Sequence, residues 1–164
     1  MSRFATGVTV VTVREGRDDI GSTATAFTSV SAEPPTVMLG VLASSYLAEA
    51  IDLAGGFAVN VLGSGHRALA GRFAAEGRPS ARLLLAGEAH HRGEHTGALI
   101  LDTALAALEC RVATRVAAGD HVVYLASVES LPGTGAPEPG ASPLVRYAGR
   151  YRSLAQQQGP ASPQ

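Results

Sequence analysis

The chain has 164 residues, a formal net charge of −1 and 46% hydrophobic residues. Its length predicts one domain, because typical domains hold on the order of 100 to 150 residues. The 13 cationic residues form no long block, which argues against nucleic acid as a partner. No uncharged apolar run approaches the roughly 20 residues of a membrane-spanning helix, so no membrane partner is expected. The start carries no export signal, and a cytoplasmic location is therefore expected.

Two absences in the composition narrow the chemistry further. All cationic residues are Arg, so Schiff-base chemistry and a phosphate-binding lysine of the Walker type are excluded. The single cysteine, Cys110, excludes an internal disulfide and a C-x-x-C pair. We expect Cys110 to be a small core residue, and anions to be bound by Arg, hydroxyl groups and backbone N–H groups.

The first third of the chain predicts three strands. Residues 7–13, "GVTVVTV", are largely β-branched, and "REGRDDIG" supplies turn residues before the β-prone run "STATAFTSVS" at 22–31. Two prolines, Pro34 and Pro35, then favour an extended entry into a buried strand over residues 37–41.

The middle of the chain predicts the helices. One begins at Ser44 or Ser45, which can cap it, and ends at the glycines 55 and 56. Residues 57–61 predict a strand, "HRALAGRFAAEG" a short second helix, residues 81–85 a short helix or strand, and residues 87–97 a surface loop.

The clearest hairpin joins residues 104–116 to residues 121–130 through the turn "AAGD". On its first strand, alternation predicts a buried face with Leu108, Cys110, Val112 and Val116, and a polar face with Glu109, Arg111 and Arg115. A last ordered segment follows at 144–154, and residues 155–164 predict a disordered tail. Residues 1–154 therefore form one mainly β domain, a closed or nearly closed antiparallel barrel with a few short helices.

A glycine motif suggests another fold. Gly63, Gly65 and Ala68 spell G-x-G-x-x-A between a predicted strand and a predicted helix, and Glu88 follows about twenty residues later. This spacing is that of a dinucleotide fingerprint in a Rossmann dehydrogenase. The long antiparallel hairpin that follows does not fit that fold. We therefore interpret the motif as a strand-to-helix turn whose two glycines absorb unusual backbone angles.

Three histidines in "HHRGEH", His90, His91 and His95, raise the question of a metal site. No cysteine or closely spaced second carboxylate completes a coordination sphere, and the flanking residues are those of a solvated loop. We expect no metal there.

Two polar stretches are better candidates for a binding site. The Ser- and Thr-rich run at 21–35 offers small side chains and backbone N–H groups to the edge of a flat heteroaromatic ligand, although a polar edge strand explains it equally well. Ser44 and Ser45 stand at a predicted helix N-terminus, which suits a phosphate, although ordinary capping is the commoner reason for such residues.

Taken together, these stretches resemble the flavin reductase family, small proteins with an FMN-binding split barrel. The matching segments include "RFATGVTVVTV", "GSTATAFTSVSAEPPTVMLGV", "SSYLAEAI", "GGFAVNVL" and "ALAALECRVATRVAAGDHVVYLASVES", and they run in order from residue 3 to residue 154. The resemblance implies an antiparallel split barrel and reduction of FMN or FAD by NADH or NADPH. It also implies a homodimer that supplies reduced flavin to a partner monooxygenase.

The resemblance also implies roles for individual residues. Thr23, Ala24, Thr25 and Ala26 would line the isoalloxazine edge, with Ser29 and Ser31 beside it, and Ser44 and Ser45 would hold the flavin phosphate. Asn60 would lie beside the site, Arg72 would face the phosphate, His121 would stand near the nicotinamide as the one catalytic candidate, and Arg150 and Tyr151 would close over the site.

The chain departs from the family at the phosphate segment. Family members commonly carry a Lys before the double serine and a Ser or Thr after it, where this chain has Ala43 and Tyr46. Weaker phosphate binding, or binding that depends on Arg, would follow. A flavin-binding protein of the same fold without reductase activity therefore stays an alternative.

Overall fold

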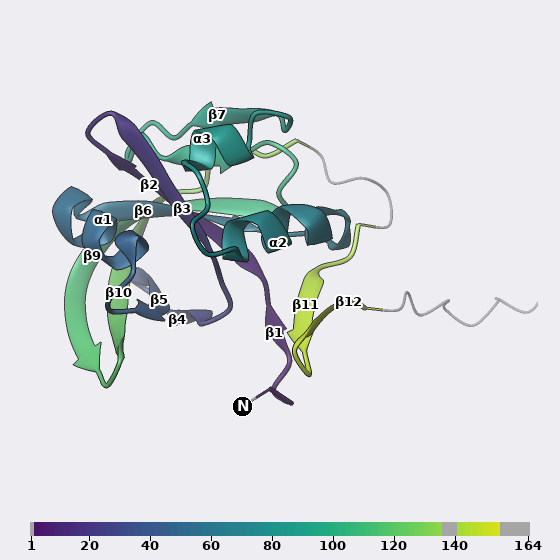
Figure 1. Ribbon diagram of the computed structural model, residues 1–164. Helices are drawn as coiled ribbons and strands as arrows, with labels where there is room; N and C mark the ends of the chain where they lie inside the picture. The colour runs from purple at the N-terminus through teal and green to yellow at the C-terminus, as the bar shows by residue number, and fades with distance from the viewer. Residues whose placement is uncertain (1, 136–140, 155–164) are drawn as a thin grey trace, which may run out of the picture.

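The computed structural model describes residues 2–135 and 141–154, so the predicted tail at 155–164 lies outside the described residues. Seven antiparallel strands form one curled sheet in the order β3-β2-β6-β9-β10-β5-β4, and two small sheets, β1-β11-β12 and β7-β8, pack beside it (Figure 1). The predicted class, a mainly β antiparallel split barrel, is confirmed. The strands are β1 (Thr6–Gly7), β2 (Thr9–Glu15), β3 (Asp18–Ala24), β4 (Phe27–Ala32), β5 (Pro35–Leu42), β6 (Gly56–Val61), β7 (His90–Arg92), β8 (Leu99–Leu101), β9 (Ala106–Ala118), β10 (His121–Ser130), β11 (Leu144–Tyr147) and β12 (Arg150–Ser153). The helices are α1 (Tyr46–Ala54), α2 (Arg67–Ala74) and α3 (Ala81–Leu84), with a 3₁₀ turn, η1 (Ser64–His66).

The Ser- and Thr-rich run does not form the single strand that its composition predicts. β2 turns back at Gly16, which has a φ of +55°, and pairs with β3. The chain then bends at Thr25 and Ala26, and β4 pairs with β5 instead. β3 and β4 therefore become the two edges of the sheet, and the corner between them is where the barrel is split.

Helix α1 follows its predicted signals. The Ser45 hydroxyl accepts a hydrogen bond from the Ala48 N–H at 3.2 Å, and Gly55 ends the helix with a φ of +66°. Leu47 and Ile51 bury the inner face of α1 in the barrel core. The Ser45 end of the helix thereby lies directly after β5.

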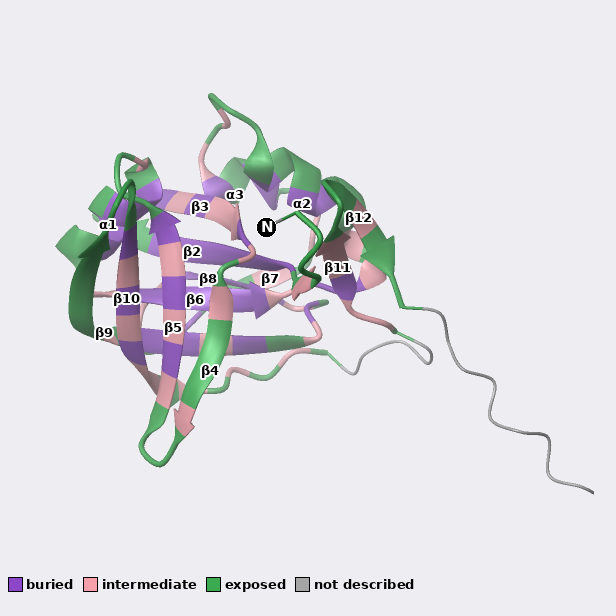
Figure 2. Cartoon of the chain, turned by 90° about the horizontal axis from the view of Figure 1, so that it is seen from below, coloured by how far each residue is buried: buried purple, intermediate pink, exposed green. Residues whose placement is uncertain are grey.

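Two large hydrophobic clusters and a small third one lie in the described residues, and buried positions alternate with intermediate ones along β5 and β10 (Figure 2). The larger cluster fills the barrel, with Phe57 and Tyr124 among its largest side chains. The second large cluster lies under α2 and α3 and includes Phe73. Cys110 is buried and free, as predicted. Burial raises the pKa of this thiol to about 12.

The predicted loop at 87–97 contains a strand. β7 pairs with β8, and the turn between them uses Gly97 with a φ of +67°. The prediction for Glu109 was also wrong, because its side chain is buried. The backbone N–H groups of His95 and Thr96 and the hydroxyls of Thr96 and Ser130 donate hydrogen bonds to it. This carboxylate binds the 93–97 turn, whereas Val116, predicted to be buried, is exposed.

The glycine motif is not part of a parallel βαβ unit. β6, which precedes it, pairs antiparallel with β2 and β9. Gly63 and Gly65 have ordinary negative φ, so our interpretation that they absorb unusual angles was wrong. The turn is instead closed by His66, whose Nδ1 accepts a hydrogen bond from the Gly63 N–H at 3.1 Å.

Candidate functional site

Strand pairing brings three of the predicted segments together at one end of β5. The Gly40 N–H donates to the Ala26 carbonyl at 2.8 Å, which places the β3–β4 corner beside the end of β5. On the other side of β5, Leu42 pairs with His121, and the Ala43 N–H donates to the Asp120 carbonyl at 3.0 Å. The Ala26 corner, the double serine and His121 therefore surround the C-terminal end of one strand.

The turn from β5 into α1 has free donors for an anion. The Ser45 hydroxyl is used within the turn, since it donates to the Leu42 carbonyl at 2.7 Å and accepts from Ala48. The hydroxyl of Ser44 and the N–H groups of Tyr46 and Leu47 have no partner among the described residues. Together with the positive end of the helix dipole, these groups suit a phosphate.

Next to this turn, the outer face of the sheet has no side chain at Gly40 and only a methyl group at Ala26. A Cβ atom added at Gly40 would lie 3.2 Å from the Cβ of Ala26, on the outer face of the pair. Val122 and Tyr124 are buried, so His121 and Val123 lie on this same outer face. A flat ring can therefore approach the backbone between Ala26 and Gly40 closely, with His121 nearby, and these residues fit a flavin.

His121 itself is exposed, and its ring pairs with its neighbour. The distance from His121 Nδ1 to Asp120 Oδ1 is 2.7 Å. This hydrogen bond lowers the pKa of Asp120. The pair fixes the orientation of the imidazole and leaves the other ring nitrogen open to a ligand.

A buried tyrosine fixes α1 against the hairpin that carries His121. The Tyr124 hydroxyl donates to Asp52 Oδ1 at 2.8 Å, and it lies 3.1 Å from the Ala48 carbonyl. Arg115 on β9 contacts both Asp52 oxygens, at 3.0 and 3.1 Å. Burial is the main cause that raises the pKa of Tyr124 to about 12, so its hydroxyl stays a donor.

The other predicted residues of β3 face the protein. The Thr23 hydroxyl donates to the Ala70 carbonyl of α2 at 2.7 Å, and the Ala24 side chain is buried. Thr25 is half-buried at the corner. Their roles at the isoalloxazine edge stay predictions, which depend on their backbone rather than on their side chains.

Ser29 and Ser31 lie at a different place from the double serine. They line an open groove of about 440 Å³ with Phe27, Pro35 and Val37. This groove is at the N-terminal end of β5, whereas Ser44 and Ser45 follow its C-terminal end. The structure therefore divides the predicted serines between two ends of the strand.

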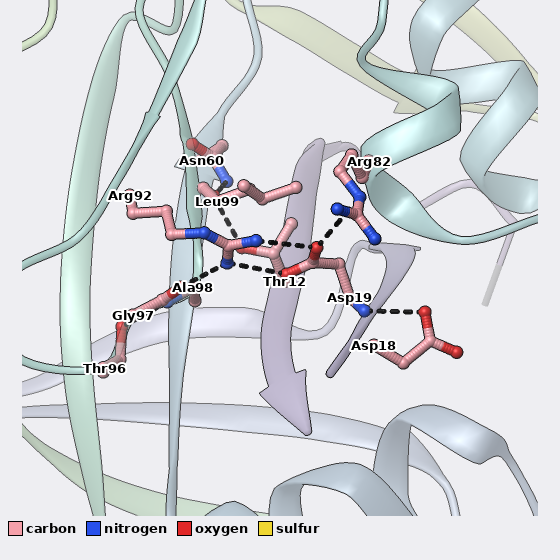
Figure 3. Close-up of polar contacts among 10 residues, drawn as sticks. All are labelled: Thr12, Asp18, Asp19, Asn60, Arg82, Arg92, Thr96, Gly97, Ala98 and Leu99. Carbon is pink, nitrogen blue, oxygen red and sulfur yellow. Dashed lines mark hydrogen bonds and ion pairs between the residues drawn. The ribbon is translucent and has the colours of Figure 1, made fainter. Parts of the chain in front are cut away.

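Asn60 and Arg72 have partners within the chain. The Asn60 side chain is buried and donates to the Leu99 carbonyl (Figure 3). It also donates to the Val10 carbonyl and accepts from the Leu101 N–H at 2.7 Å. It thereby joins β2, β6 and β8. Arg72 pairs with Glu88 at 2.9 Å on the exposed side of α2. Their predicted contacts with flavin stay untested, and each would compete with these partners.

Arg150 and Tyr151 lie far from the double serine. Both are on β12, which is at the opposite end of the molecule from α1 (Figures 1 and 2). The Arg146 guanidinium stacks over the Tyr151 ring at 4.7 Å from its centroid. Within a single copy of the chain, this segment does not close over the turn at Ser44 and Ser45.

Sequence reasoning missed one hollow, of about 300 Å³, between α1 and the start of β3. Tyr46, Gly21, Arg78 and Ser80 are among its lining residues. Arg78 follows a glycine and precedes a proline in a segment with no periodicity, so only its Arg side chain could have drawn attention. Among residues 2–135 and 141–154, no three His, Cys, Asp or Glu side chains are grouped to hold a metal. No helix in the same residues is long and apolar enough to cross a membrane.

An antiparallel split barrel with a flat backbone face, beside a helix N-terminus that suits a phosphate, defines a flavin-binding oxidoreductase of the split-barrel class. The chain belongs to the flavin reductase like domain family, whose model matches residues 1–155.

Similar proteins agree with this assignment. The chain is 38% identical to the NADH-dependent FMN reductase AsuE2 of Streptomyces nodosus subsp. asukaensis, over 94% of this chain and 81% of that protein. It is 39% identical to the reductase component of 4-hydroxyphenylacetate 3-monooxygenase from Thermus thermophilus, over 94% and 92%. The solved structure of the Streptomyces globisporus NADH:FAD oxidoreductase SgcE6, in complex with NAD and FAD fragments, superposes with a TM-score of 0.84 at 32% identity, over 96% of this chain and 90% of that chain.

Proposed function

We propose that this protein is an NAD(P)H-dependent flavin reductase that supplies reduced flavin to a partner monooxygenase. The observation that carries the proposal is the juxtaposition of the free donors after β5 with the bare Ala26–Gly40 face. The similarity to reductases, one of them a component of a monooxygenase, supports the same conclusion.

A bound flavin supplies the chemistry, because it accepts a hydride from the nicotinamide ring when the two rings stack. The protein has to hold and orient the rings and leave one flavin face open. Ser44 and the N–H groups of Tyr46 and Leu47 would hold the phosphate. The backbone at Ala26 and Gly40 would support the ring, and His121 would contact the nicotinamide side.

The flavin can be FMN or FAD, and the donor NADH or NADPH; the names of AsuE2 and SgcE6 favour NADH. We propose a cytoplasmic homodimer. A second copy would allow Arg150 and Tyr151 to reach a site that they do not reach within one chain.

A flavin-binding protein without reductase activity is the second candidate. The observation in its favour is Ala43, which leaves the turn without a cation at the position where the family commonly has Lys. Such a protein would bind flavin without accelerating the oxidation of NADH or NADPH.

Steady-state assays that cross both flavins with both nicotinamides test the proposal. We expect oxidation of NADH well above a blank without protein. Ser44→Ala, which removes only a free hydroxyl, should raise the KM for flavin several-fold and leave kcat within about twofold. Ser127→Ala, on β10 but outside the site, serves as the control. Flavin binding without NADH or NADPH oxidation would select the second candidate.

A further inference from the structure

The hollow between α1 and β3 adjoins the proposed phosphate site. Tyr46, which lines the hollow, directly follows Ser45 and is the first residue of α1. The opposite wall is formed by the start of β3 at Asp18 and by the segment that holds Arg78 and Ser80. The turn at Ser44 and Ser45 therefore has a different feature on each side. The flat Ala26–Gly40 face lies before it, at the end of β5, and the hollow lies after it, at the first turn of α1.

Arg78 brings a positive charge to the hollow without a carboxylate partner. Its Nε donates to the Gly21 carbonyl at 2.7 Å, and Nη1 donates to the Ala75 carbonyl at 3.2 Å. These bonds fix the guanidinium. Its Nη2 has no acceptor among the described residues, and no carboxylate of those residues lies within ion-pair distance of Arg78. Burial lowers the pKa of Arg78. A partly dehydrated cation of this kind favours an anion beside it.

The acidic residues of the hollow do not cancel this charge. Asp19 is already paired with Arg92, at 2.8 and 3.0 Å, and lies 3.7 Å from Arg82. Asp18 accepts a hydrogen bond from the Asp19 N–H at 2.8 Å, and its side chain is at the exposed rim. A carboxylate there is an acceptor for an amino group on a ligand.

Tyr46 offers an aromatic surface at the same place. Its side chain, a large ring in the first turn of the helix, is 78% exposed, more than Leu53, the other exposed large apolar residue of α1. An exposed ring beside a cation is the combination that binds a nucleotide base and its phosphate, because bases stack on aromatic side chains. A hollow of about 300 Å³ is at the small end of ligand pockets and suits one part of a larger molecule.

We infer that this hollow holds the adenosine monophosphate half of FAD, with the adenine on Tyr46 and its phosphate beside Arg78. The chain therefore uses FAD in preference to FMN. This inference rests on the proposed function, since it takes the flavin phosphate to lie at Ser44 and Ser45. It assigns a role to Tyr46, the residue at which this sequence departs from its family.

A series of three flavins separates the two parts of the site. Calorimetric titration of the intact protein with riboflavin, FMN and FAD gives the gain in affinity from each added group. The step from riboflavin to FMN reports on the phosphate turn, and the step from FMN to FAD reports on the hollow. We expect the wild-type protein to bind FAD about tenfold more tightly than FMN, the size of one base stacked on an aromatic ring.

Tyr46→Ala should remove most of this preference by raising the Kd for FAD about tenfold, with the Kd for FMN changed less than twofold. Tyr46→Phe should keep the preference, because the ring is retained. Leu53→Ala, which removes another exposed large side chain of α1, is the matched control and should change neither constant. Arg78→Gln should also lower the preference for FAD. The thermal unfolding of this variant is measured alongside, because the Arg78 side chain also donates hydrogen bonds to two carbonyls.

Three results would overturn the inference. The first is equal affinity of the wild-type protein for FMN and FAD. The second is an equal loss of affinity for both flavins in Tyr46→Ala. The third is a rise in the KM for NADH in that variant with the flavin preference intact. The last result would assign the hollow to the adenine of NADH. Any of them can occur in an active reductase, whereas absence of NADH oxidation with either flavin would contradict the proposed function instead.

Discussion

At the scale of single residues, buried carboxylates hold in place the segment at 87–97, which the sequence predicts to be a surface loop. Asp19 is 1% exposed and binds both terminal nitrogens of Arg92, whose Nη1 also donates to the Gly97 carbonyl at 2.8 Å (Figure 3). Glu109 binds the same turn through the backbone N–H groups of His95 and Thr96. Hydrogen bonding to Thr96, Ser130 and His95 outweighs burial and lowers the pKa of Glu109, so this carboxylate stays ionised.

Replacing the buried partner of Arg92 should therefore destabilise the protein. In Asp19→Asn, the neutral amide cannot accept both hydrogen bonds, and Arg92 loses its counter-charge. We expect a loss of about 2 kcal/mol in the free energy of unfolding, below the full value for a buried pair because Arg92 is partly exposed. Urea unfolding followed by circular dichroism measures it. Asp18→Asn is the neighbouring control and should cost less than about 0.5 kcal/mol; equal costs would mean that the Asp19 pair contributes nothing specific.

At the scale of elements, side chains at the ends of helices decide where the helices sit. Ser45 caps α1, and Tyr124 and Arg115 hold that helix through Asp52. His66 closes the turn before α2 and lies 3.0 Å, through Nε2, from the Thr103 hydroxyl. Because Nδ1 accepts from the Gly63 N–H, the imidazole in the folded protein is neutral, with its proton on Nε2.

The neutral His66 predicts a pH dependence of stability. Burial lowers the pKa of His66 in the folded protein, and Glu88 opposes this effect only in part. As the pH falls, His66 of the unfolded chain binds its proton first, near pH 6.5. The stabilising contribution of the neutral His66 is therefore fully present above that pH. The contribution is lost as the pH falls from there through the lowered pKa. Urea midpoints between pH 5 and 8 should fall more steeply toward low pH in the wild-type protein than in His66→Gln.

A second histidine provides the control for that measurement. The His95 side chain is exposed, and only the backbone N–H of His95 bonds to Glu109. His95→Gln should therefore keep the wild-type slope. If His66→Gln also kept it, the effect of burial on the His66 pKa would be too small to matter for folding.

At the scale of the whole molecule, the candidate site lies on an outer face of the barrel, and the segment predicted to close it lies at the other end. The face around Gly40 includes the exposed Leu42 and Val116, whose apolar surfaces a second copy would cover. Arg150 and Tyr151 on β12 would then belong to the site of the opposite copy. This arrangement is part of our proposal of a homodimer.

Mixing two damaged variants tests this arrangement. Ser44→Ala with Ser45→Ala damages the phosphate turn, and Arg150→Ala damages the closing segment. If each site is built from two copies, co-refolding equal amounts should restore about a quarter of the wild-type activity, because half of the dimers are mixed and one of their two sites is intact. Light scattering on the same samples measures the mass. A monomer, or activity no higher than the mean of the two variants, would contradict the shared site.

Most of the local structure was determined by the sequence itself. The capping serine, the C-terminal glycine of α1, the β-branched runs and the alternation in the 104–130 hairpin act within a few residues, so periodicity and propensity were enough to predict them. The family resemblance followed from the same stretches. The order of the strands, the corner at Thr25 and Ala26 and the burial of Glu109 depend on partners distant in the sequence, and only the tertiary structure decided them.

The candidate site divides along the same line. Ser44, Ser45 and the Ala26 segment stand out in the sequence because their chemistry is local, whereas the partners of Asn60 and Arg72 come from strands and loops far along the chain. Arg78 meets Tyr46 only because α1 and the segment after α2 pack against the same strand, 32 residues apart in the chain. The sequence supplied the groups that can bind a flavin, and the folding of the barrel decided which of them face the same space, because that depends on long-range packing rather than on local propensity.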